Sequence, residues 1–135
     1  IANGAAAAGK KVTLFFTFWG LNIIKKQNKP AVEKDLMGKM FGWMLPSSSE
    51  KLKLSKMNMG GMGSKMMRMI MKQKRIDSLE SLIQQAIDNG VEMIACTMSM
   101  DVMGVKQEEL LDHVKLGGVA TYLERAEEAN LNLFI

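Results

Sequence analysis

The chain has 135 residues, of which 47% are hydrophobic and 24% are charged, and it contains two prolines. This composition excludes general disorder, and the length suits one domain with a sizeable core, so we treat residues 1–135 as a single domain. One cysteine excludes an internal disulfide framework and a multi-cysteine zinc site, which favours a reducing compartment such as the cytoplasm. No uninterrupted apolar run approaches the ~20 residues needed to cross a bilayer, so we expect no membrane span.

The net charge of +4 is unevenly distributed along the chain. Residues 51–75 contain lysines and arginines but no acidic residue, and the positive electrostatic field of such a segment favours the binding of anions.

The first half of the chain predicts two helices around one strand. Residues 2–8 are rich in alanine and precede Gly9, as at the end of a helix. Residues 12–18 carry large apolar groups at both parities, which predicts an interior strand covered on both faces. Residues 21–24 predict a short helix that runs to the surface at Lys25, and glycines and prolines up to residue 49 indicate a partly helical excursion.

The second half predicts further helices and strands in alternation. The expected elements are a glycine-rich loop at 55–64 that opens a methionine helix at 66–71, a helix at 79–87 with a capping-box-like start at Asp77 and Glu80 and an end at Gly90, a buried strand at 91–96, a helix at 106–114, a helix at 119–129 and a strand at 131–135. This alternation predicts an α/β fold: a three-layer sandwich with a mainly parallel sheet flanked by helices. Functional sites in such folds lie beyond the carboxyl ends of the strands, where Trp19-Gly20 and Cys96-Thr97 are expected.

Cys96 has two interpretations. A free cysteine is most often a small buried hydrophobe. At the exit of a central strand, however, the backbone N–H groups of a helix starting at Thr97 would stabilise the thiolate, which is the nucleophilic form. His113, the single histidine, lies in a polar pattern that favours the surface, so we assign no Cys–His dyad, and we expect Asp101 to cap a helix.

The methionines and the glycine-rich loop suggest other ligands less strongly. Thioether sulfur is a ligand for copper(I), but Met59, Met62, Met66 and Met69 recur at helical spacing, which favours a core or a docking face. The loop at 60–63 could hold an anion through its N–H groups, although no Walker pattern is present. We expect no nucleic-acid binding, because the basic segment has methionines instead of stacking aromatics.

Four stretches carry a resemblance to a known family. They are "LFFTFWGL" (14–21), "LSKMNMGGMG" (54–63), "ACTMSMDVMG" (95–104) and the terminal "NLFI" (132–135). In them the chain resembles the DsrE/DsrF-like sulfur-relay family, in its branch labelled peroxiredoxin-like or sulfurtransferase. The resemblance implies an α/β sandwich of parallel strands, a homo-oligomer, and a cysteine at the position of Cys96 that carries sulfane sulfur as a persulfide. It also implies a strand before the first helix that this sequence lacks, so either other residues complete the sheet or one edge is exposed.

We therefore predict a cytoplasmic sulfane-sulfur carrier or sulfurtransferase with Cys96 as the catalytic residue, whose partners are donor and acceptor proteins with thiols. Whether Cys96 turns over or only carries sulfur is left open. We expect no cofactor and no metal. The residues assigned to substrate binding are Trp19, Gly20, Asn58, Gly60, Gly61, Gly63, Thr97 and Ser99. The alternative is a non-catalytic binding or adaptor module, with an anion or nucleotide site at the glycine-rich loop or a methionine-rich docking face.

Overall fold

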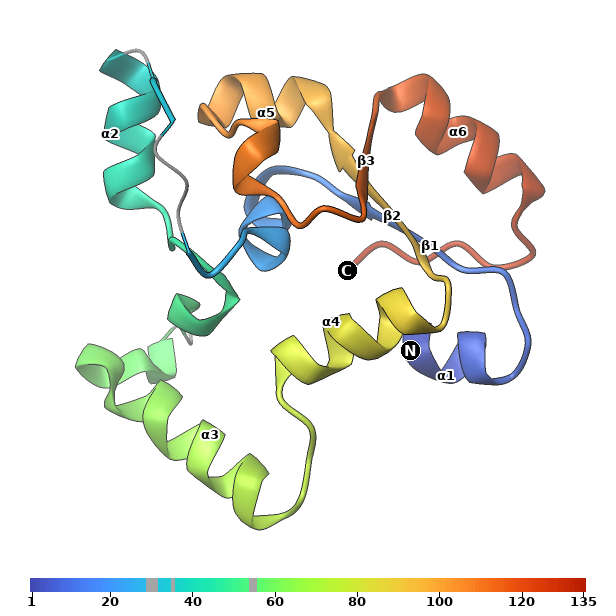
Figure 1. Ribbon diagram of the computed structural model, residues 1–135. Coiled ribbons are helices and arrows are strands. Elements are labelled where there is room, and N and C mark those ends of the chain that lie inside the picture. The colour runs from blue at the N-terminus through green and yellow to red at the C-terminus, as the bar shows by residue number, and fades with distance from the viewer. Residues whose placement is uncertain (29–31, 35, 54–55) are drawn as a thin grey trace.

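The computed structural model describes residues 1–28, 32–34, 36–53 and 56–135. Its sheet has three parallel strands in the order β1 (Thr13–Phe16), β2 (Glu92–Cys96) and β3 (Val114–Gly117), as Figure 1 shows. The register pairs Phe16 with Ala95 and Cys96 with Gly117, so β2 is the central strand and its carboxyl end lies between those of its neighbours. The predicted α/β fold with a parallel sheet flanked by helices is confirmed.

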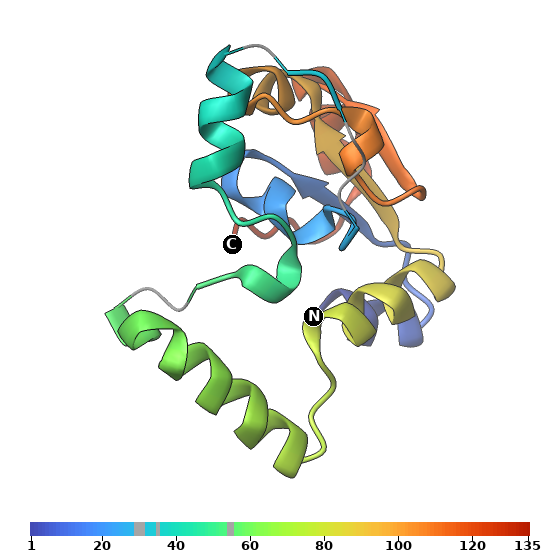
Figure 2. The same ribbon diagram turned by 60° about the vertical axis from the view of Figure 1, so that its left-hand side comes forward.

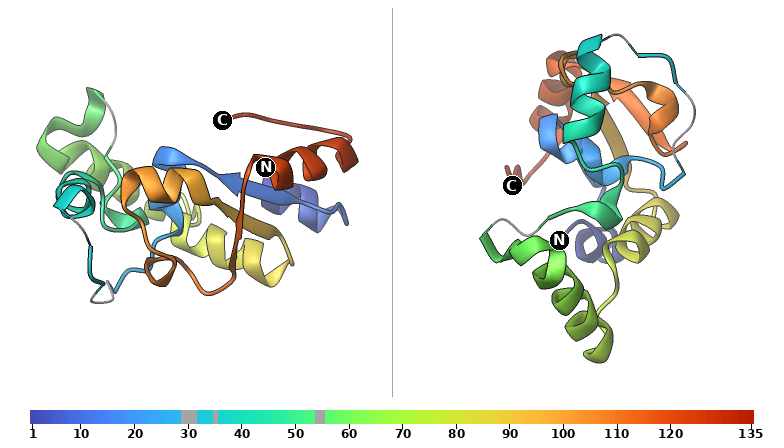
Figure 3. Two further views of the ribbon diagram at one scale, coloured as in Figure 1. Left: turned by 90° about the horizontal axis from the view of Figure 1, so that it is seen from above. Right: turned by 90° about the vertical axis from the view of Figure 1, so that its left-hand side faces the viewer.

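Helices cover both faces of this sheet (Figure 3). The α-helices are α1 (Ala2–Ala7), α2 (Leu36–Met44), α3 (Met62–Gln73), α4 (Leu79–Asp88), α5 (Thr97–Met103) and α6 (Val119–Glu128). The 3-10 helices are η1 (Phe18–Ile24), η2 (Ser49–Lys51), η3 (Lys56–Gly61) and η4 (Gln107–Glu109). Within the described part of the chain, no helix is both long enough and apolar enough to cross a membrane.

The hydrophobic core lies between the sheet and the helices α1 and α4. Met93 and Ala95 of β2 belong to this core together with Ala86 of α4. Because alternate residues of a strand point to opposite faces, Phe15 of β1 lies on the other side, where its ring centroid is 5.4 Å from that of Tyr122 in α6. The sheet is thus the middle layer of three, as predicted.

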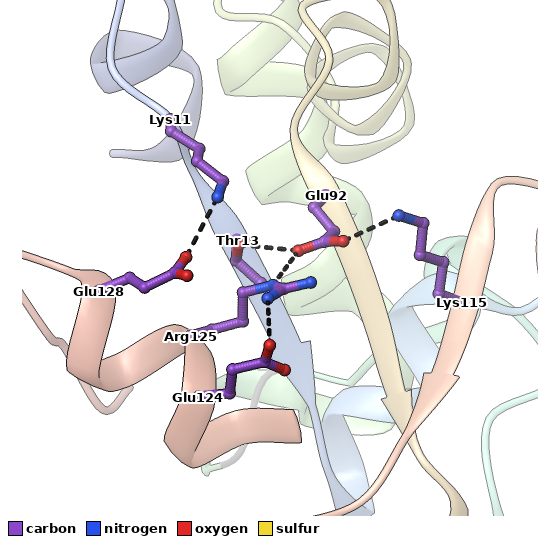
Figure 4. Close-up of polar contacts among 7 residues, drawn as sticks. All are labelled: Lys11, Thr13, Glu92, Lys115, Glu124, Arg125 and Glu128. Carbon is purple, nitrogen blue, oxygen red and sulfur yellow. Dashed lines mark hydrogen bonds and ion pairs between the residues drawn. The ribbon is translucent and has the colours of Figure 1, made fainter. Parts of the chain in front are cut away.

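A carboxylate on the central strand forms hydrogen bonds with residues of both neighbouring strands and of α6 (Figure 4). Glu92 accepts hydrogen bonds from Thr13 on β1 at 3.2 Å, from Lys115 on β3 at 2.9 Å and from Arg125 on α6 at 2.9 Å. The hydrogen bonds from Arg125 and Lys115 lower the pKa of Glu92 from 4.5 to about 2. One side chain therefore links all three strands to the helix that covers them.

Gly117 occupies a position on β3 that leaves no room for a side chain. A Cβ atom there would lie 2.8 Å from Cγ2 of Ile94 and 3.1 Å from Cβ of Thr121. We expect Gly117→Ala to lower the free energy of unfolding by about 1–2 kcal/mol, because a buried neighbour must move. Chemical denaturation measures this change. Gly118→Ala is the matched control, since a Cβ at Gly118 meets no atom within 4 Å; equal losses for the two variants would contradict the steric account.

The predicted interior position of the first strand is wrong for the described sheet. Among the described residues, β1 pairs with β2 alone and forms one edge, and all four of its residues are half-buried. Its large apolar groups at both parities are explained by Leu14 and Phe16 packing on the core while Phe15 meets α6. The short helix predicted next is present as η1, but Lys25 is buried instead of reaching the surface, and its Nζ donates to Oδ1 of Asn22 at 2.8 Å.

Two predicted elements near the carboxyl end are also wrong. Residues 106–114 form no α-helix, because their backbone bonds elsewhere: Lys26 N–H donates to the carbonyl of Glu109, and Leu111 N–H to that of Ile24. Residues 131–135 form no strand and are an exposed segment after α6. Asn132 links this segment to the helix, because its Nδ2 donates a hydrogen bond to the carbonyl of Ala126 at 3.1 Å.

The helices at 2–8, 66–71, 79–87 and 119–129 are confirmed as α1, α3, α4 and α6, and the strand at 91–96 as β2. The start of α4 differs from the prediction in detail. Ser78 is the N-cap, and its hydroxyl accepts a hydrogen bond from Ser81 N–H, so Asp77 and Glu80 do not form the expected capping box.

Candidate functional site

Cys96 lies at the junction of the central strand and the helix that follows it. It is the last residue of β2 and the N-cap of α5, and it is 3% exposed. The sequence favours this change because the apolar run of β2 gives way to Thr97 and Ser99, whose types are common at the start of a helix. The predicted helical turn directly after Cys96 is thereby confirmed.

Two hydroxyl groups meet beside the thiol. Ser99, on the first turn of α5, has no exposed surface, and its Oγ lies 2.7 Å from Oγ1 of Thr17, the residue that follows β1. The register explains the meeting: Phe16 is opposite Ala95, so Thr17 comes next to Cys96. Our sequence reasoning assigned Ser99 but missed Thr17. The available signal was its position one residue beyond a predicted parallel strand.

The surroundings of Cys96 act on its pKa in both directions. Burial raises the pKa of the thiol, because a charged thiolate loses hydration. Hydrogen bonding from the Ser99 hydroxyl, from the backbone N–H groups of Ser99 and Met98 and from the Thr17 hydroxyl lowers it, and the net pKa lies below its ordinary value. Cys96 is the N-cap residue of α5, but its side chain makes no capping hydrogen bond. The thiolate is therefore favoured by the four donors together and not by a single cap.

The other residues predicted at the strand ends lie around this junction with different exposures. Trp19 is 68% exposed and Gly20 is half-buried, both on η1, which packs against α5. Thr97 is exposed, and its Oγ1 donates to the carbonyl of Gly117 at 3.4 Å, which joins the start of α5 to the end of β3. The structure therefore places Thr97 and Ser99 next to Cys96 at the start of α5, and Trp19 and Gly20 on the 3-10 helix that packs against α5.

The glycine-rich loop is not part of that neighbourhood. Asn58, Gly60 and Gly61 belong to η3 and Gly63 to α3, and α3 lies at the opposite end of the molecule from α5 in Figures 1 and 2. The helix that follows the loop, α3, lies away from the carboxyl edge of the sheet (Figures 1 and 2). Gly60 and Gly61 have φ angles of 68° and 97°, which glycine adopts readily. A binding role for the four residues stays a prediction.

Two further residues considered in the sequence, His113 and Asp101, are exposed. His113 is exposed, as predicted. Asp101 lies inside α5 and is exposed, so the prediction that it caps a helix is wrong; Cys96 holds the N-cap position instead.

A shallow hollow of about 270 Å³ adjoins the start of α5. Thr97, Asp101, Lys106 and Leu116 contribute to its lining, which is both polar and apolar. The hollow begins one residue from Cys96, on the side towards β3.

Comparison of the whole sequence with known families assigns the chain to one of them. The sequence profile described as the DsrE/DsrF/DrsH-like family matches residues 1–134. The chain belongs to this family. That assignment confirms the resemblance drawn from the four sequence stretches.

Two relatives of this DsrE/DsrF/DrsH-like chain align over its whole length. Uncharacterized protein YrkE of Bacillus subtilis is 49% identical over 135 residues, which are 84% of its own length. Sulfur carrier protein DsrE2 of Allochromatium vinosum is 37% identical over 139 residues, which are 86% of its own length.

In this DsrE/DsrF/DrsH-like site, the geometry suits nucleophilic sulfur chemistry. The lowered pKa increases the thiolate fraction of Cys96 near neutral pH. The Thr17–Ser99 hydroxyl pair, which has one O–H left to donate, and two N–H groups can stabilise negative charge on sulfur, and burial limits access by water. The site thus offers one nucleophile and a set of hydrogen-bond donors.

Proposed function

We propose that this chain carries sulfane sulfur as a persulfide on Cys96 and passes it between thiol-bearing partners. The observation that carries the proposal is the placement of one thiol, with a lowered pKa, beside the paired hydroxyls of Thr17 and Ser99. Family membership and the relative named sulfur carrier protein DsrE2 support it.

The transfer is two successive displacements at sulfur. The Cys96 thiolate attacks the outer sulfur of a donor persulfide, R–S–SH; the donor S–S bond breaks, and the donor leaves as a thiolate that takes up a proton. In the second step, an acceptor thiolate attacks the outer sulfur of Cys96–S–SH and releases the Cys96 thiolate. Each step exchanges one S–S bond for another, so neither an oxidant nor a reductant is needed.

A single thiol fits a carrier better than a self-contained peroxidase. Peroxidase chemistry leaves a sulfenic acid, which a second thiol must resolve, and the chain contains one cysteine. A persulfide needs only the thiol of an acceptor. We therefore propose that both the donor and the acceptor are thiol proteins.

Access to the buried sulfur requires a partner that reaches into the junction. Cys96 is 3% exposed, whereas Met98 of α5 and Trp19 of η1, the helix that packs against α5, are 57% and 68% exposed. The hollow is lined by Thr97, the residue that follows Cys96, and gives a partner space at the start of α5. We propose that Trp19, Gly20, Thr97 and Ser99 line the route of transfer, and that the protein works as one domain in a reducing compartment, the cytoplasm.

Intact-mass measurement tests the carrier function. After incubation with polysulfide or a persulfidated donor, the folded protein should gain one sulfur, about 32 Da, and dithiothreitol should remove it. Cys96→Ser should show no gain.

The matched control is the same incubation of the protein unfolded in denaturant, where the thiol has neither hydroxyl beside it. Slower loading of the unfolded chain supports a built site. No adduct on the folded parent with several donors, together with an unreactive Cys96, would overturn the carrier and favour the alternative binding module.

A further inference from the structure

Helix α3 exposes an apolar stripe with cations beside it. Met62, Met66 and Met69 are 68%, 51% and 66% exposed, and they fall on one face of the helix with Ile70. Lys65 and Lys72 are exposed on the same helix, and the sequence from 51 to 76 contains no acidic residue. An apolar face of this extent on a described helix is a docking surface, because it gains free energy when it leaves water.

Helix α6 presents the complementary combination. Val119 and Leu123 are 57% and 52% exposed on its outer side, and Glu124 and Glu127 are exposed next to them. The segment after α6 adds the exposed apolar residues 131 and 133–135, and it turns back along the helix, where Asn132 bonds to Ala126. The one cation of α6, Arg125, is paired with Glu92 and also, at 3.5 Å, with Glu124, so Glu127 is the acidic residue of this face that has no ion pair among the described residues.

The charges decide how these two surfaces pair. Packing α3 on α3 of a second copy brings lysines together, and packing α6 on α6 brings glutamates together, so both symmetric contacts are opposed by repulsion. Packing α3 on α6 matches apolar with apolar and positive with negative. The helices are also close in length, about 18 Å and 15 Å at 1.5 Å per residue.

We propose that α3 of one copy docks on α6 of a second copy. Within one molecule the two helices lie at opposite ends (Figures 1 and 3), so a chain cannot satisfy its own surfaces. The contact is therefore heterologous: in a pair of copies, one α6 surface and one α3 surface stay free for further neighbours, and the assembly grows into a ring or an open chain. The proposal does not depend on sulfur transfer by Cys96.

Mixing two blocked variants tests the proposal. Met66→Asp removes the α3 surface, and Leu123→Asp removes the α6 surface. Both side chains are about half exposed, so the fold should persist in each variant, and circular dichroism checks this. By light scattering from low to several hundred micromolar, the parent should form species larger than a dimer and each variant alone should be a monomer. An equimolar mixture should give dimers and nothing larger, because one intact α3 meets one intact α6.

Val102→Asp is the matched control, since Val102 is 57% exposed on α5 and belongs to neither surface; it should assemble as the parent does. Met69→Asp and Val119→Asp replace the first pair if either variant loses structure. A monomeric parent, assembly by either blocked variant, or a mixture that stays monomeric would each overturn the proposal. Assembly by one blocked variant alone would indicate a symmetric contact through the surface that it keeps intact, and a mixture that stays monomeric would indicate a contact that does not join α3 to α6.

Discussion

Replacing Ser99 with alanine is expected to raise the pKa of the Cys96 thiol and so to slow its alkylation at neutral pH. Ser99 is fully buried. Its hydroxyl is the donor that lowers this pKa most, against the opposing effect of burial. Without it, desolvation of the thiolate is less compensated. At a pH below the pKa of the thiol, a rise in that pKa lowers the thiolate fraction, and the alkylation rate falls with it. The measurement is the alkylation rate as a function of pH.

Thr17→Val should shift the pH profile in the same direction, because it removes the second hydroxyl, while Thr17→Ser should restore it. Thr97→Val is the control: its hydroxyl donates to the carbonyl of Gly117. A Ser99→Ala profile that superimposes on the parent's would show that the hydroxyls do not act on the thiol.

The second large effect concerns stability. We expect Glu92→Gln to lower the free energy of unfolding at pH 7 by about 2 kcal/mol, since an uncharged amide bonds less strongly to Arg125 and Lys115. The pKa of Glu92 in the folded protein is about 2, below its ordinary value of 4.5. The carboxylate therefore contributes its full stabilisation above about pH 4.5, and the contribution is lost as the pH falls towards 2.

Denaturant titrations at pH 7 and pH 3 measure both the size and the sign of this effect. The difference between parent and variant should shrink at pH 3, because the parent then gains protons on unfolding that the variant cannot bind at this position. Glu127→Gln, on the exposed side of α6, should cost little at either pH. A difference that stays constant with pH would contradict the assignment of the stabilisation to the charged form.

The sequence was sufficient where one local pattern decided the structure. The apolar run of β2 followed by polar residues identified the strand, the helix after it and Cys96 between them. Thr17 was missed because its role depends on the pairing of Phe16 with Ala95, and no local pattern contains that register. The position of the residue that completes the site is therefore a property of the tertiary fold.

The errors elsewhere have the same origin. The glycine-rich loop was recognised as a loop before a helix, but its distance from the thiol depends on where α3 lies, which the loop itself does not determine. Residues 131–135 are apolar enough for a strand, yet they bond to α6 through Asn132. Residues 106–114 have helical periodicity, but their backbone groups pair with residues 24–26.

The hydroxyl contact between Thr17 and Ser99 joins residues 82 positions apart. Such a contact forms only after a long segment of chain has closed, and parallel strand pairing over long separations is a slow event in folding. A nascent or partly folded chain therefore has a thiol of ordinary reactivity, and the reactive form appears when β1 and β2 pair. The rate at which the thiol is labelled during refolding should therefore report the pairing of β1 with β2.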